Sequence, residues 1–88
     1  MSSIPPWAKR MATSRELVIT ARIGRSGVKD SVLEELDSQL KARNLIKVKL
    51  NKGLTERGGR NEIWDYISNE LNAQLVVARG NVAVFYRG

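Results

Sequence analysis

The chain has 88 residues, enough for one domain with a single modest core. It contains no Cys and no His, which excludes a disulfide framework, a Cys or His metal site, a thiolate nucleophile and an imidazole general base. The net charge of +6 favours polyanionic partners, and residues 1–29 alone carry six basic side chains and one acidic. We therefore expect a binding protein without catalysis, cofactor or metal.

No apolar run approaches the ~20 residues that a membrane span needs. The first residues contain no apolar stretch typical of a signal peptide. We expect a cytoplasmic, monomeric protein with no membrane partner, in which residues 1–88 form one domain and residues 1–6 are flexible.

The first predicted element is a short basic helix through Met11, with Ser3 as its cap and a proline in its first turn. The segment 17–23 is rich in β-branched residues and predicts a strand. One face of that strand would carry Leu17, Ile19, Ala21 and Ile23.

The segment 28–43 has apolar residues every four positions and predicts an amphipathic helix. Its acidic first half and basic end suit the helix macrodipole, and Asn44 is a plausible stop. Residues 45–50 alternate as in a strand, with Lys47 and Lys49 on the face away from the apolar side chains.

Residues 52–59 predict a flexible loop, and residues 60–71 a second amphipathic helix. Two strands follow at 74–79 and 82–87, and Gly80-Asn81 between them indicates a hairpin. The order α-β-α-β-α-β-β predicts an α/β (α+β) two-layer fold, with a mixed four-stranded sheet and the two main helices on one face. Each β-α-β passage favours parallel neighbours.

The candidate site is the G-x-x-G motif that joins a strand to a helix. Glycines allow a close approach of backbone to ligand, and a helix N-terminus offers free N–H groups to an anion. This arrangement suits a phosphodiester backbone, which KH modules hold with a similar loop. The predicted contacts are Gly24, Arg25, Ser26 and Gly27, flanked by Lys29, Lys47, Lys49 and Lys52.

Two weaker signals remain. Arg57-Gly58-Gly59-Arg60 resembles an RGG element, whose Arg57 and Arg60 could reach phosphates or could simply belong to a connector. Trp7, beside Lys9 and Arg10, is the best candidate for stacking on a base, whereas Trp64 is better explained as core.

The G-x-x-G loop, the strand Leu-Ile-Lys-Val-Lys at 45–49 and the closing hairpin 79–87, in that order, resemble the YhbY family. Its members are stand-alone CRM domains (chloroplast RNA splicing and ribosome maturation). The resemblance covers about residues 7–88. It implies a fold similar to the C-terminal domain of a bacterial translation initiation factor.

The resemblance also implies RNA binding, with ribosomal RNA of large-subunit precursors as the partner. Lys29 and Ser31 depart from the family's usual residues, and the first helix is shorter. These departures leave the RNA target open. Two other classes stay open as well: a small basic DNA-binding chromatin protein, and a module that binds another protein.

Overall fold

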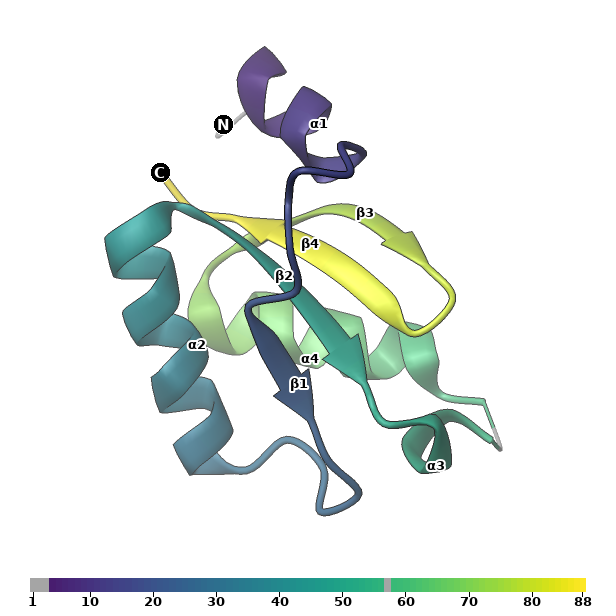
Figure 1. The fold of residues 1–88 in the computed structure, drawn as a ribbon. Helices are drawn as coiled ribbons and strands as arrows, with labels where there is room; N and C mark the ends of the chain where they lie inside the picture. Colours follow the sequence, from purple (N-terminus) through teal and green to yellow (C-terminus); the bar gives the residue numbers. More distant parts are fainter. Residues whose placement is uncertain (1–3, 57) are drawn as a thin grey trace.

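The computed structural model describes residues 4–56 and 58–88. Its elements are α1 (Pro6–Ala12), β1 (Ala21–Ile23), α2 (Asp30–Arg43), β2 (Leu45–Leu50), α3 (Lys52–Thr55), α4 (Arg60–Leu71), β3 (Gln74–Arg79) and β4 (Val82–Tyr86). They form the predicted α+β fold, with helices layered on a mixed four-stranded sheet (Figure 1).

The strand order is β1-β2-β4-β3. β1 and β2 are parallel, and β4 runs antiparallel to both β2 and β3. The first β-α-β passage therefore gives parallel neighbours, as expected. The second does not, because β4 folds back from the hairpin and lies between β2 and β3. Hydrogen-bonding groups on both sides of β4 are thus paired, and β1 and β3 become the two edges.

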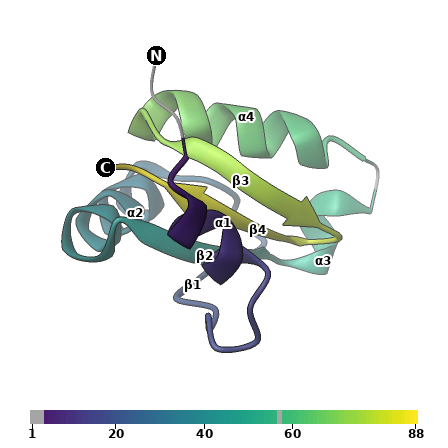
Figure 2. The same cartoon turned by 90° about the horizontal axis from the view of Figure 1, so that it is seen from above.

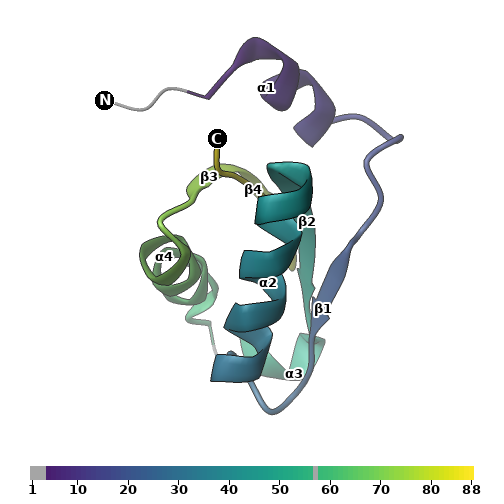
Figure 3. The same cartoon turned by 90° about the vertical axis from the view of Figure 1, so that its left-hand side faces the viewer.

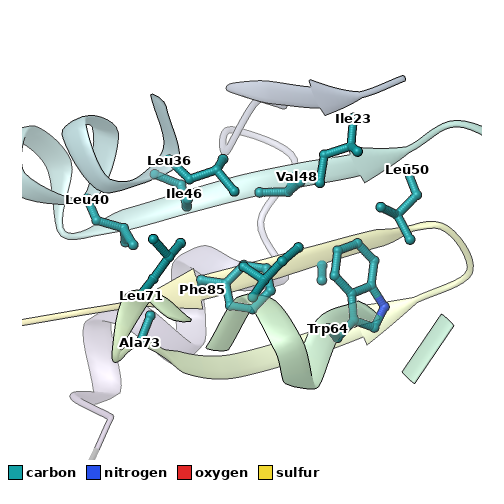
Figure 4. Packing of buried hydrophobic residues seen from close by; sticks show 12 residues of the cluster. Ile23, Leu36, Leu40, Ile46, Val48, Leu50, Trp64, Leu71, Ala73 and Phe85 are labelled. Carbon is teal, nitrogen blue, oxygen red and sulfur yellow. The ribbon is translucent and has the colours of Figure 1, made fainter. Parts of the chain in front are cut away.

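The main core lies between the sheet and the pair α2 and α4, which cover the same face of it (Figure 3). Alternation along β2 sends Ile46, Val48 and Leu50 into this core, where each is at most 1% exposed. Each such side chain stabilises the fold by roughly 1.5–3 kcal/mol. Trp64 of α4 meets Phe85 of β4 edge-on, with ring centroids 5.8 Å apart (Figure 4).

A second, smaller cluster lies on the opposite face of the sheet, under α1 (Figure 2). Ala8 and Ala12 of α1 pack there against Leu45 and Val84. Leu17 also packs against this cluster, so the prediction that it shares a face with Ile23 is wrong. Because α1 covers only one end of this face, the end nearer the G-x-x-G loop is left open.

Several predicted boundaries differ from the structure. α1 runs one residue further than predicted, to Ala12, and α2 begins at Asp30 instead of residue 28, because Lys29 is still extended and forms the N-cap. Residues 17–20 are not in a strand, and β1 is only three residues long. Residues 52–55, predicted as flexible loop, form the single turn α3, because the side chain of Asn51 accepts a hydrogen bond from the Gly53 amide and caps it. β4 ends at Tyr86. The predicted cap Ser3 lies outside the described residues.

The C-terminal end of the chain is fastened to both main helices by Arg87. Its guanidinium donates to Asp37 Oδ1 at 2.8 Å, to the Leu71 carbonyl at 2.8 Å and to the Asp37 carbonyl at 3.2 Å. Hydrogen bonds from Arg87 and then Lys41 hold the pKa of Asp37 below its ordinary value of 3.8. Asn44 ends α2 as predicted, in the left-handed conformation with a φ of 65°.

Candidate nucleic-acid interface

The G-x-x-G segment forms a tight turn between β1 and α2, at the lower end of the molecule in Figure 1. The Gly27 amide donates to the Gly24 carbonyl at 3.0 Å. Gly27 has a φ of +85°, which L side chains rarely adopt. Gly24 does not have a positive φ, and a Cβ placed on it would meet nothing within 4 Å. The two glycines thus differ: the backbone itself requires Gly27, whereas Gly24 leaves open space beside the chain.

The side chain of Arg25 lies against α3. This short helix packs beside the Gly24–Gly27 turn, at the ends of β1 and β2. A Cβ built on Gly53 would stand 3.7 Å from both Cγ and Nε of Arg25. The Asn51 amide, just before α3, donates to the Ile23 carbonyl at 2.8 Å. Because α3 is tied to β1 in this way, the side chain of Arg25 has a support for its stem while the residue stays exposed.

A groove of about 420 Å³ opens beside this turn, where the carboxyl ends of β1 and β2 lie side by side. Arg22, Lys49 and Lys52 line it, together with the backbone around Gly24. All three cations are exposed. In the described ranges 4–56 and 58–88, every ion pair involves Asp37, so none neutralises these side chains.

The groove continues into a row of side chains that crosses the whole sheet. In register, Arg22 pairs with Lys49, Lys49 with Val82, and Val82 with Arg79. Residues in register point to the same side of a sheet, here the side away from α2 and α4. We call Arg22, Lys49, Val82 and Arg79 the basic row.

Acidic side chains are concentrated on the other layer. α2 and α4 together carry seven of the nine carboxylates of the chain, and the four strands carry none. The molecule is therefore polarised, with a negative helical face and a positive end formed by the turn, the groove and the basic row. Such an arrangement attracts and orients a polyanion.

Comparison with known proteins agrees with these features. The profile of the CRS1/YhbY (CRM) domain matches residues 8–87. This chain belongs to the CRS1/YhbY family.

Three relatives are each named a probable RNA-binding protein. One from Methanocaldococcus jannaschii is 33% identical over 90% of this chain and 60% of its own length. One from Bacillus subtilis is 30% identical over 75% of this chain and 67% of its own length. One from Pseudomonas aeruginosa is 35% identical over 74% of this chain and 61% of its own length. The chain thus spans about three-fifths of the length of two of them.

A solved structure supports the fold. The solution structure of a Staphylococcus aureus protein superimposes with a TM-score of 0.75 at 24% identity, covering 98% of this chain and 90% of that chain. The CRM-type architecture predicted from the motif order is confirmed by this likeness and by the family match.

Within this CRM domain, most predicted contacts lie at the positive end, but not all are equivalent. Lys49 and Lys52 line the groove beside Gly24. Lys29 is exposed and stands at the N-cap of α2. Arg60 opens α4 and donates to Asn81 Oδ1 at 3.1 Å, which joins α4 to the β3–β4 hairpin. Arg57 lies outside the described residues.

Lys47 differs from Lys49 in its environment, although the two side chains lie on the same face of β2. Its ammonium donates to the Leu17 carbonyl at 3.2 Å and is half-buried. This bond fastens the segment before β1 to the sheet. Lys47 therefore has a structural task that the sequence pattern did not reveal.

The structure adds Arg22 and Arg79 as candidate contacts, which sequence reasoning missed. Each is the outward-facing cation of an edge strand, in Ala21-Arg22-Ile23 and in Val77-Ala78-Arg79. The alternation was visible in the sequence, but the strand order that aligns both with Lys49 was not. Trp7 lies 43% exposed on α1, edge-on to Tyr86 with ring centroids 5.8 Å apart.

Proposed function

We propose that this CRM domain binds structured RNA, and that the Gly24–Gly27 turn and the flanking cations hold the phosphate backbone. The observation that carries the proposal is the coincidence of the turn, the groove and the basic row at one end of the molecule. The relatives' names support RNA as the ligand.

The open space beside Gly24 supports close contact between the two backbones. With no Cβ there, a phosphate oxygen can approach the main chain of the turn. Arg25 is exposed beside this space and offers a planar fork of donors, which matches phosphate geometry. Lys52 and Lys49, along the groove, then accompany the next phosphates toward the basic row.

The remaining cations extend this path. Lys29 lies on the α2 side of the turn, and Arg60 lies on the hairpin side. The proposal includes Arg57, three residues before Arg60, and Ser26 in the turn as a neutral hydrogen-bonding group. Lys47 is retained as a contact through the two ammonium hydrogens that do not bond to Leu17.

For the RNA itself we propose ribosomal RNA in precursors of the large subunit, on the strength of the CRM resemblance. We further propose that the protein acts as a cytoplasmic monomer and without catalysis. No helix within residues 4–56 and 58–88 is long and apolar enough to cross a membrane.

The test measures affinity for ribosomal RNA fragments against salt concentration. Arg25→Gln, Arg22→Gln and Lys49→Gln should each weaken binding and lower the slope of log K against log salt by about one. Arg43→Gln is the matched control, because it removes the same charge from an exposed site at the end of α2. If Arg43→Gln and Arg25→Gln weaken binding equally, affinity depends on net charge alone and the proposed interface is wrong.

A second arm separates RNA from DNA and the turn from the rest. The double variant Arg25→Asp with Ser26→Asp should abolish binding while circular dichroism stays unchanged, because both residues are exposed. Duplex DNA should compete more weakly than ribosomal RNA, since DNA lacks the 2′-hydroxyl and looped bases. Undiminished RNA binding by the double variant, or preference for duplex DNA, contradicts the proposal.

A further inference from the structure

A second cavity, of about 370 Å³, lies on the open face of the sheet between the end of α1 and the basic row. Its floor consists of three valines of the β3–β4 hairpin, Val77, Val82 and Val84. Ile19 and the segment 12–15 form the facing wall. The cavity is within the range of roughly 300–1,000 Å³ typical of small-molecule sites.

The rim of this cavity is cationic. Arg15, Lys47 and Arg79 line it, and its lining contains no carboxylate. An apolar floor under three cations does not suit a bare phosphate, which needs only the cations. It suits a flat group with apolar faces and polar edges that belongs to a polyanion, which is the description of a nucleobase.

The polar groups around the cavity are mostly donors. The Lys47 ammonium donates one of its three hydrogens to the Leu17 carbonyl and has two left to donate. The Ser14 hydroxyl oxygen accepts from the Glu16 amide, which leaves its hydrogen available to donate. Both arginines carry donors only. A base that presents acceptors without an exocyclic amino donor on the contacted edge is therefore favoured: guanine through O6 and N7, or uracil through its keto oxygens, whereas adenine and cytosine would place an amino donor there.

The cavity is also continuous with the path proposed for the phosphates. Val82 belongs both to the floor of the cavity and to the basic row, where it stands in register with Lys49. Arg79 likewise belongs to both. An RNA strand whose phosphates contact Arg22 and Lys49 would thus pass directly beside the cavity.

We propose that this cavity receives one unpaired keto base, guanine or uracil, of the bound RNA. The inference rests on the proposed function and deepens it. The turn and the basic row would bind the phosphate backbone of any RNA sequence, whereas this cavity would discriminate between bases. Val82 and its neighbours support one face of the base, Arg15 or Arg79 stacks on it, and Lys47 with Ser14 donates to its edge.

The experiment compares two single-stranded RNA repeats of about eight nucleotides, alternating G and U or alternating A and C, by fluorescence anisotropy. The wild-type chain should bind the GU repeat at least about fivefold more tightly, the lower end of what one base contact contributes. Val82→Phe, which fills the cavity with a ring favoured in strands, should remove that preference. Leu75→Phe is the control, an aromatic substitution at an exposed site of the same hairpin.

Arg15→Gln provides a second variant in an exposed loop, where folding is not at stake, with Arg43→Gln as its control. It should lower affinity for the GU repeat more than for the AC repeat, whereas Arg25→Gln in the turn should weaken both equally. Equal affinities of the wild-type chain for the two repeats, or a preference that survives both Val82→Phe and Arg15→Gln, overturns the inference. Failure of the proposed function looks different: neither repeat binds in a salt-dependent way.

Discussion

Alanine substitutions at the two glycines of the turn should have opposite consequences. Gly27 has a φ of +85°, and an alanine there would be strained by about 1–2 kcal/mol. In a domain of this size each kcal/mol moves the melting temperature by about 4–8 °C. Gly24→Ala meets no atom within 4 Å and requires no positive φ. It should leave stability unchanged or raise it by up to about 1 kcal/mol, because alanine restricts the unfolded chain.

RNA binding should follow the reverse order once stability is taken into account. The methyl group of Gly24→Ala occupies the space that we assign to the RNA backbone, so affinity should fall in a protein that is fully folded. Gly27→Ala should bind in proportion to the fraction that keeps the turn, and therefore better at lower temperature.

The assay combines urea unfolding with RNA titration at two temperatures. Unfolding midpoints give the free energies at constant m-value, and titrations below the melting range give the affinities. Wild-type stability of Gly27→Ala would refute the argument from φ. Wild-type affinity of Gly24→Ala would refute close approach of the two backbones at this position.

The other predictions concern the link between the C-terminal end and α2. Arg87→Met should lower the free energy of unfolding by about 1–3 kcal/mol, since the guanidinium hydrogen-bonds the main-chain carbonyls of Leu71 and Asp37. Lys41 pairs with the carboxylate of Asp37, but its side chain is 74% exposed, so Lys41→Met should change the free energy of unfolding by less than about 0.5 kcal/mol. Thermal unfolding of both variants checks this, and equal losses would contradict it. Because the folded pKa of Asp37 is lowered, its contribution to stability is present above pH 3.8 and is lost as pH falls through the lowered pKa. Asp37→Asn should therefore flatten the acid side of the stability profile, and an NMR titration should place the pKa of Asp37 below 3.8; a value at or above 3.8 contradicts the argument.

The parts of the fold that the sequence predicts well are those with a local cause. The alternation in 45–50 needs only a sheet with one apolar face, and β2 has the predicted bounds. Asn44 tolerates the left-handed conformation better than most residues, so the end of α2 could be read directly. The Gly80-Asn81 turn is likewise local, and it joins β3 to β4 as predicted.

The parts that the sequence did not predict depend on distant partners. Residues 17–20 have the composition of a strand, yet they form the connection from α1 to β1. Two hydrogen bonds to β2 hold them there: the Lys47 ammonium donates to the Leu17 carbonyl, and the Thr20 amide donates to the Lys47 carbonyl. α3 needs the cap from Asn51, whose own amide is fixed by Ile23 across the sheet. No pattern within either segment contains this information.

The interface follows the same division. The turn at Gly24–Gly27 was recognisable because a strand, two glycines and a helix adjoin in the chain. The basic row was not, because Arg22 and Arg79 lie 57 positions apart and on opposite edges of the sheet. They share a row only because β4 inserts between β2 and β3 and carries Val82 between Lys49 and Arg79. The same insertion places Val82 and Val84 under the second cavity. The strand order, which the sequence did not predict, therefore brings the proposed phosphate-binding surface and the proposed base site next to each other.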